Sequence, residues 1–287
     1  MAVQNSLQRS RGNQRLGISA YLTADAVKNQ INQVVGGKDG QRFISAIVSA
    51  VNTNPALQEC TNQSILSGAL LGESLKLSPS PQLGQYYLVP FNDKNKGKVA
   101  QFQLGYKGYI QLAIRSGQYK KLNVLAIKEG ELIRFDPLNE EIEVRLIEDE
   151  EAREQATTIG YYAMFEYTNG FRKAIYWSKR KMEAHALKYS KGYQAKKGYT
   201  FWEKDFDGMA YKTMLRQLIS KWGIMSIDMA SAIDSDMAVI NEDGTKDYVD
   251  NDDAVFDMEP LQEDAPQQSQ PEPAAPVDAK AALFGNN

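Results

Sequence analysis

The chain has 287 residues, of which 43% are hydrophobic and 24% charged, and its formal net charge is −3. That length allows one large domain or two small ones, and the composition allows a packed core. No apolar run approaches about 18 residues and the basic N-terminal segment lacks an apolar stretch, which argues against a membrane span and a secretory signal. The single cysteine, Cys60, forms no intrachain disulfide, so we expect a cytoplasmic protein.

The net charge averages two regions of opposite sign. Residues 171–225 contain thirteen Lys and Arg residues and four acidic ones, whereas residues 239–287 contain twelve acidic residues and two lysines. A basic body followed by an acidic tail is typical of proteins that bind a polyanion. Because the tail is also rich in Pro, Gln and Ala, we expect residues 239–287 to be disordered and to bind partners. We expect residues 1–20 to form a flexible arm.

Apolar residues at helical spacing predict three helices in the first part of the chain. The first begins after Thr23, which would cap it, and ends before Gly36. The second covers about 43–53 and stops before a proline, and the third covers about 61–77.

Strands and further helices follow. Residues 159–167 and 171–177 alternate well, and Asn169-Gly170 between them is the strongest hairpin signal in the chain. The pattern predicts an α+β fold, a small antiparallel sheet packed by helices, in one domain over residues 21–238. The other strands are expected over 86–91, 99–104, 123–128, 131–135 and 141–147, and the helices over 105–116, 178–189, 203–222 and 226–238.

Residues suited to catalysis are few. The only histidine, His185, lies on the apolar stripe of its predicted helix, which indicates a core residue. No phosphate-binding G-x-x-x-x-G-K-[ST] motif is present, so ATP use is not expected. The eleven acidic residues between Glu129 and Glu154 allow two interpretations, a magnesium-dependent nuclease centre or a solvated surface. Alternation of Glu141 and Glu143 with apolar residues, and the consecutive charges at 148–151, favour the surface.

Lysines, glycines and aromatic residues are interleaved in residues 188–202. Cations neutralise phosphates and aromatic rings stack on bases, so this composition favours contact with a nucleic-acid strand. The alternative is a surface loop whose aromatic residues anchor it to the core. The candidate strand contacts in this part of the chain are Arg180, Lys188, Lys191, Lys196, Lys197, Phe201, Lys212, Arg216 and Lys221.

A second segment, residues 82–117, also combines tyrosines, glycines and cations. Lys107 and Arg115 would share the outer side of the helix predicted over 105–116, and Tyr106 and Tyr109 would follow its apolar side. We consider all four as strand contacts, the cations as phosphate ligands above all. In the alternative interpretation, the glycines only permit close packing and the tyrosines belong to the core.

The sequences QLGQYYLVPFN at 82–92 and QLGYKGYIQLAIRSG at 103–117 resemble the signature of the RecT-type phage recombinases, and the similarity extends over about residues 27–238. The resemblance implies an ATP-independent, cofactor-free protein that coats single-stranded DNA as a ring or helical filament and anneals it to a complement. Magnesium would act only as a DNA counterion. The implied partners are a companion exonuclease and the host single-strand binding protein. A passive single-strand binding protein and a magnesium nuclease remain the alternatives.

Overall fold

The computed structural model describes residues 16–36, 39–93, 96–198 and 200–247. The expected arm at residues 1–15 lies outside them, whereas residues 18–20 are helical, contrary to the expectation for the arm. Thr23 ends the first helix, and Ala24 is the N-cap of the second. The N-terminal part consists of α1 (Ile18–Thr23), α2 (Asp25–Val35), α3 (Gly40–Thr53), the 3-10 helix η1 (Pro55–Glu59) and α4 (Asn62–Ser74).

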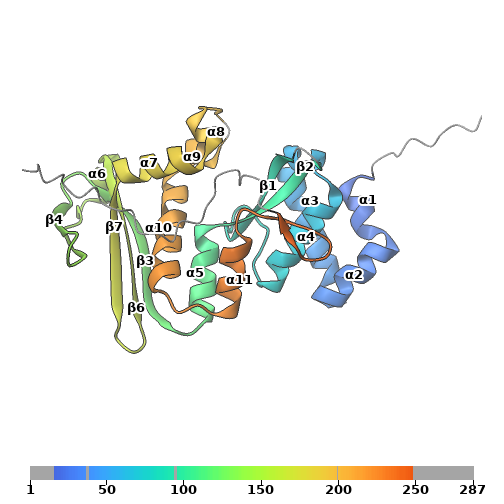
Figure 1. Cartoon of the computed structure of the whole chain (residues 1–287), viewed down its shortest axis with the longest axis horizontal. Coiled ribbons are helices and arrows are strands. Elements are labelled where there is room, and N and C mark those ends of the chain that lie inside the picture. The colour runs from blue at the N-terminus through green and yellow to red at the C-terminus, as the bar shows by residue number, and fades with distance from the viewer. Residues whose placement is uncertain (1–15, 37–38, 94–95, 199, 248–287) are drawn as a thin grey trace, which may run out of the picture. The chain divides into compact units, whose positions relative to one another are not determined.

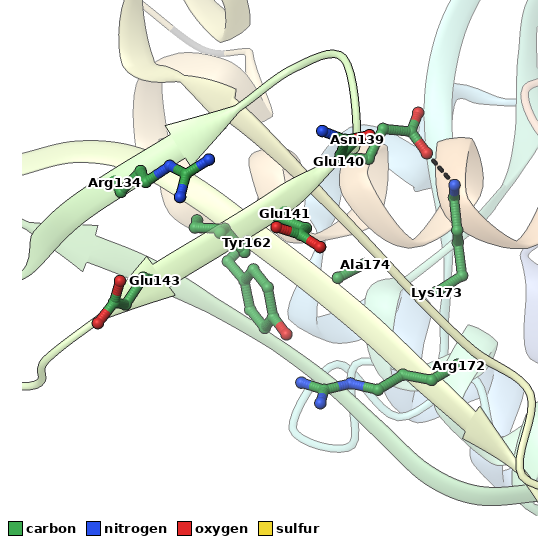
Figure 2. Close-up of a pocket in the computed structure, with 10 residues that line it drawn as sticks. Arg134, Asn139, Glu140, Glu141, Glu143, Tyr162, Arg172, Lys173 and Ala174 are labelled. Carbon is green, nitrogen blue, oxygen red and sulfur yellow. Dashed lines mark ion pairs between the residues drawn. The ribbon is translucent and has the colours of Figure 1, made fainter.

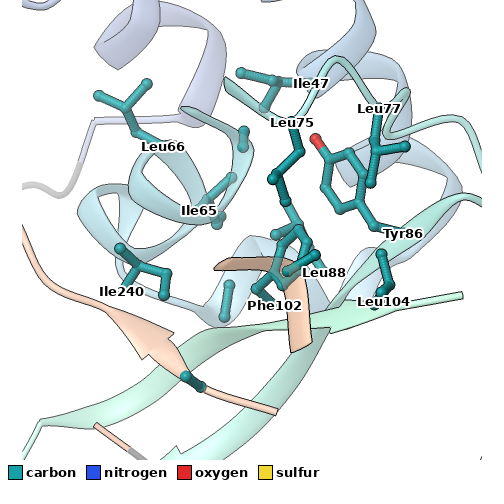
Figure 3. Close-up of a cluster of buried hydrophobic side chains, with 14 of the residues drawn as sticks. Ile47, Ile65, Leu66, Leu75, Leu77, Tyr86, Leu88, Phe102, Leu104 and Ile240 are labelled. Atoms are coloured by element: carbon teal, nitrogen blue, oxygen red, sulfur yellow. The ribbon is translucent and has the colours of Figure 1, made fainter. Parts of the chain in front are cut away.

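Of these helices, α4 and η1 pack on a two-stranded antiparallel ribbon, and α1, α2 and α3 pack on the other helices (Figure 1). The ribbon is formed by β1 (Tyr86–Asp93) and β2 (Gly97–Leu104), with Tyr86 opposite Leu104. Tyr86 is fully buried, and its ring stacks on Phe102 with centroids 5.1 Å apart. Figure 3 shows both rings among the side chains of α3 and α4. The helix α5 (Tyr106–Arg115) follows the ribbon directly and closes this core.

A three-stranded antiparallel sheet forms the second part of the fold, in the order β3 (Tyr119–Lys128), β6 (Thr158–Tyr167) and β7 (Arg172–Ser178). Side chains alternate between its faces. Tyr161 and Phe165 point to one face, which α7 (Lys179–Tyr189) and α10 (Phe206–Trp222) cover. Tyr162 and Met164 point to the other, which the hairpin of β4 (Leu132–Asp136) and β5 (Glu141–Val144) covers. The short helix α6 (Glu150–Gln155) precedes β6.

The helix expected over 203–222 is interrupted at Asp205. Its backbone leaves the helical region, and its carboxylate accepts a hydrogen bond from the Gly208 amide at 2.9 Å, so it caps the longer helix. Two further short helices form in and just after the segment 188–202, which has no apolar periodicity. The elements around this break are α8 (Lys191–Gln194), α9 (Phe201–Lys204), α10 and, after it, α11 (Ile227–Ser235).

The folded part continues beyond residue 238, where the tail was expected to begin. Two short strands, β8 (Val239–Ile240) and β9 (Lys246–Asp247), form a hairpin, and Ala238 bridges to Phe102 of β2. Val239 and Ile240 are buried, and Figure 3 shows Ile240 beside Ile65. The expectation for the tail is therefore wrong for residues 239–247, and residues 248–287 lie outside the described part.

Truncation after Ala238 is expected to destabilise the protein, because it removes these two buried side chains. Burial of one Val or Ile side chain contributes about 1.5–3 kcal/mol, so the unfolding free energy should fall by about 3–6 kcal/mol in urea denaturation. Truncation after Asp247 keeps β8 and β9 and serves as the control. Equal stability of the two truncated chains would contradict the packing of β8.

The α+β class predicted from the sequence is confirmed, with several small antiparallel sheets and packed helices. Within the described ranges, none of the helices combines the length and apolarity required to cross a membrane.

Candidate nucleic-acid interface

Two glycines of the 82–117 segment, Gly105 and Gly108, serve internal packing. Gly105 is the N-cap of α5 and Gly108 lies in its first turn, where both approach the loop before β1. The Gly105 amide donates to the Gln85 carbonyl at 2.9 Å. A Cβ at Gly105 would lie 2.1 Å from the Gly84 oxygen, and one at Gly108 would lie 2.2 Å from the Gln85 oxygen. Real side chains do not tolerate these distances. For these two glycines the structure therefore supports the alternative interpretation, in which they permit close packing of a strand-turn-helix.

The four candidate contacts of α5 divide between the core and the surface. Tyr109 is fully buried, so its expected contact with a strand is wrong. Tyr106 is half-buried, with its ring 5.7 Å from that of Tyr211. Arg115 is exposed, but its guanidinium donates to the carbonyls of Leu75 and Lys76 and closes the turn after α4.

Lys107 is exposed and forms no ion pair within the described ranges. It lies beside Gly84, and on the adjacent β1 the ring of Tyr87 contacts Phe201 of α9 at 5.5 Å. This contact brings the segment 82–117 together with the segment 188–202. Strand alternation places Tyr87 on the face of β1 opposite to that of the buried Tyr86.

Besides Lys181, six exposed cations lie on α7, α8, α9 and the turn between α8 and α9. Figure 1 shows these elements grouped near the N-terminal end of α10. None of the six cations forms an ion pair in the part of the chain that the structure describes. Like charges at this density attract a polyanion. We call this set the basic face; it consists of Arg180, Lys188, Lys191, Lys196, Lys197 and Lys204.

Most carboxylates near the basic face are engaged elsewhere. Glu203 completes a capping box with Thr200 at the start of α9, and it also accepts from the Gly198 amide at 2.8 Å. Asp205 caps α10, and Asp207 accepts from the Tyr161 hydroxyl at 2.6 Å. Three of the four acidic residues in residues 171–225 therefore stabilise the fold, and the thirteen Lys and Arg residues of the same range outnumber all four, so the field of the basic face is positive.

The aromatic residues of the 188–202 segment divide in the same way. Trp202 is buried and Tyr193 packs against it and Phe206, so these rings anchor the segment to the core. Tyr189 and Phe201 remain 40% and 37% exposed beside the lysines. The two interpretations of this segment thus apply to different residues, anchoring to the inner rings and strand contact to the outer ones.

Lys212 is buried and Arg216 is half-buried in an ion cluster, which corrects their assignment to a strand-contacting surface. Asp236, fully buried, accepts from Lys212 Nζ at 2.9 Å and from Arg216 at 2.7 Å. It also accepts from the Leu104 amide at 2.9 Å, so the cluster joins α10 to β2 and to the end of α11. Burial lowers the pKa of Lys212, and the charge of Asp236 opposes that shift.

Lys221 is exposed but lies at the far end of α10 from α9. A helix of 17 residues is about 25 Å long. Its ammonium lies 5.2 Å from the Trp222 ring centroid. The structure therefore does not bring Lys221 together with the basic face.

His185 packs among aromatic rings, 4.5 Å from Tyr189 and 5.5 Å from Trp177. Burial, with the charges of Arg216, Lys188 and Lys181, lowers the pKa of His185 to about 4. The imidazole is therefore neutral near pH 7, as expected for a core histidine.

This shift predicts a pH dependence of stability. The imidazole of His185 binds its proton more tightly in the unfolded chain than in the folded one. The contribution of neutral His185 to the unfolding free energy is therefore complete above about pH 6.5 and is lost as the pH falls toward 4. The loss attributable to this group is roughly 3 kcal/mol. Urea denaturation of the parent and of His185→Gln at several pH values isolates it, since other groups titrate in both. Parallel pH profiles would contradict the prediction.

The acidic stretch 129–154 is mostly surface, with one exception. Glu131 is fully buried and binds Arg153 at 2.6 Å. Burial raises the pKa of Glu131, but hydrogen bonds from Arg153 and from the Lys128 and Ile147 amides outweigh it and leave that pKa below its ordinary value. Among the described residues, no three His, Cys, Asp or Glu side chains are grouped so that they could hold a metal ion.

The β4–β5 hairpin and β7 enclose an open cavity of about 450 Å³ (Figure 2). Arg134, Arg172 and Lys173 line it, but so do Glu140, Glu141 and Glu143. Charges of both signs therefore meet there, unlike on the basic face, so the cavity is a poorer site for a polyanion.

An α+β scaffold with a dense basic face and a glycine-tyrosine strand-helix segment beside it is typical of a nucleic-acid-binding protein. The RecT family model matches residues 41–253, and the chain belongs to the RecT family, whose members act in single-strand annealing and DNA recombination. The uncharacterized protein YqaK of Bacillus subtilis (strain 168) is 37% identical over 289 residues, covering 97% of this chain and 94% of that protein. Protein RecT of Escherichia coli (strain K12) is 28% identical over 240 residues, covering 80% and 86%.

Proposed function

We propose that this chain anneals complementary DNA strands without a nucleotide or metal cofactor, as an oligomer that coats the strand. The observation that carries the proposal is the basic face, six exposed cations without ion pairs in the described ranges, next to Lys107. Family membership supports single-strand annealing as the activity. Partners of the kind implied by the resemblance, an exonuclease and a host single-strand binding protein, belong to the same proposal.

The chemistry of pairing suits this arrangement. Duplex formation is downhill, with stacking worth on average about 1.4 kcal/mol per step, so no fuel is required. The obstacles are phosphate repulsion and the disorder of free strands. Lysine and arginine on the sugar-phosphate backbone reduce the repulsion and leave base edges free to pair, since backbone contacts read no sequence.

The direct test mixes two complementary oligonucleotides with the full chain, without nucleotide and with EDTA, and follows duplex formation by fluorescence. We expect faster pairing than in the absence of protein. Single-strand affinity measured against salt should show a slope of log K on log salt near −5 if seven cations each neutralise one phosphate. An unchanged pairing rate would refute annealing, and salt-independent binding would refute the electrostatic contact.

Passive strand protection is the second candidate, and the exposed rings of Tyr189 and Phe201 favour it. Rings stacked on bases would hinder pairing. In that case the parent would not accelerate annealing, and Tyr189→Ala with Phe201→Ala would weaken strand binding alone. In the first proposal the parent accelerates annealing as well as binding the strand.

A further inference from the structure

An exposed apolar surface lies where the β6–β7 turn meets the linker between α10 and α11. The Ile224 amide donates to the Tyr167 hydroxyl, and the Tyr167 ring stacks on Phe171 with centroids 6.0 Å apart, so turn and linker form one continuous surface. Ile227 is 89% exposed. We call this surface the apolar patch; its exposed members are Phe171, Trp222, Ile224, Met225 and Ile227.

The rim of the apolar patch is basic. Lys173 lies over the Trp222 ring at 4.0 Å from its centroid, Lys221 lies 5.2 Å from the same centroid, and Arg172 follows Phe171 on β7. Contiguous exposed apolar side chains of this size mark a docking surface in a soluble protein. Trp, Phe, Ile and Met together with Arg are also the residue types typical of protein interfaces.

A second exposed apolar surface, in an acidic stretch of the chain, lies on the β4–β5 hairpin and the segment after it. Leu132 packs on the sheet, so its neighbour Ile133 points outward and is 57% exposed. Leu138 at the turn is 89% exposed, and Leu146 is 46% exposed. We call Ile133, Leu138 and Leu146 the hairpin surface. Exposed carboxylates occur in the same stretch of the chain, at Glu141, Glu143, Glu148, Glu150 and Glu151.

We infer that the apolar patch of one copy of this chain docks on the hairpin surface of the next copy. Each surface offers apolar side chains for burial, and a basic rim meets an acidic stretch, which is the complementarity that steers and orients association. Within one copy Glu140 of the hairpin already forms an ion pair with Lys173 beside the apolar patch (Figure 2), so Arg172 and Lys221 are the rim cations that this pair does not engage. The inference rests on the oligomer in the proposed function and names its contact.

In the contact that we infer, each copy offers its apolar patch to one neighbour and its hairpin surface to another, which makes the contact head-to-tail. Such an interface leaves one free surface of each kind at the ends of a dimer, so assembly continues into a ring or an open filament. A two-fold contact of a surface with itself would stop at the dimer. In this contact the exposed acidic residues of 129–154 serve assembly and not catalysis.

Two variants of the full chain test the contact. Met225→Ser with Ile227→Ser impairs the apolar patch, and Ile133→Ser with Leu138→Ser impairs the hairpin surface. All four side chains are at least 40% exposed, so thermal unfolding should match the parent and report intact folding. Mass photometry and sedimentation velocity, with and without an oligonucleotide, measure the assembly.

We expect the parent to form large oligomers and each variant alone to remain monomeric. An equimolar mixture should form dimers and nothing larger, because it retains one intact surface of each kind. A parent that stays monomeric, a variant that assembles like the parent, or a mixture without dimers would overturn the inference. A patch variant that assembles normally but binds a single strand at least ten-fold more weakly would assign the apolar patch to DNA instead. The annealing rate of a variant with charge reversal at Lys196 and Lys197 tests the proposed function separately.

Discussion

Charge reversal at Lys196 and Lys197 is expected to weaken single-strand binding by roughly 30-fold and to slow annealing in proportion. Both ammonium groups are exposed on the turn between α8 and α9 and form no ion pair in the described ranges. Each reversal removes one phosphate contact and adds a repulsive one, together about 1 kcal/mol per site at moderate salt. The salt slope should become shallower by about 0.7 per lost contact.

A matched control carries the same change of charge elsewhere. Lys28 of α2 and Arg42 of α3 are exposed and form no ion pair in the ranges that the structure covers, so Lys28→Glu with Arg42→Glu changes the net charge equally. Fluorescence anisotropy with a labelled oligonucleotide compares the two double variants. We expect near-parental affinity for the control. Equal weakening of both would indicate an effect of net charge alone and would remove the basic face as the site.

Replacement of Asp236 by alanine is expected to lower the unfolding free energy by about 3–5 kcal/mol, because it leaves the buried Lys212 and the half-buried Arg216 without this counter-ion. The Leu104 amide loses its acceptor in the same variant. Urea denaturation measures the effect. Asp234→Ala on the same helix breaks an exposed pair with Lys246 and should cost less than about 1 kcal/mol.

A third variant separates structure from strand contact. Asp236→Leu combined with Lys212→Met and Arg216→Met replaces the ion cluster by apolar groups and should recover much of the lost stability. Since neither cation faces solvent freely, its salt slope for single-strand binding should equal that of the parent. A shallower slope in a stable triple variant would restore Lys212 and Arg216 as phosphate contacts.

Local patterns predicted most elements because their causes are local. Asn169-Gly170 joins β6 and β7 as expected, since its turn requires a positive φ that Gly170 adopts at 87°. Thr61, Ser178 and Ser226 are the N-caps of α4, α7 and α11, near the predicted helix starts. The break at Asp205 was not predicted, because the helical periodicity of apolar residues continues through it. In the structure Asp205 caps α10 and interrupts the helix there.

Side-chain environment was harder to predict. Lys212 and Arg216 lie away from the main apolar stripe of α10, which in an isolated helix indicates solvent. In the fold that side faces β2 and the end of α11, where Asp236 pairs with both. Val239 and Ile240 were assigned to the tail because the composition beyond them is acidic, although β8 pairs with β9 and packs on α4.

The sequence by itself determined the family, through the segments at 82–92 and 103–117, and the sign and density of charge in residues 171–225, because residue identity and short spacing carry both. Only the tertiary structure decided which of those cations remain on the surface. That choice depends on partners far along the chain, Asp236 for Lys212 and Arg216 and the Leu75 carbonyl for Arg115, and no local pattern contains them.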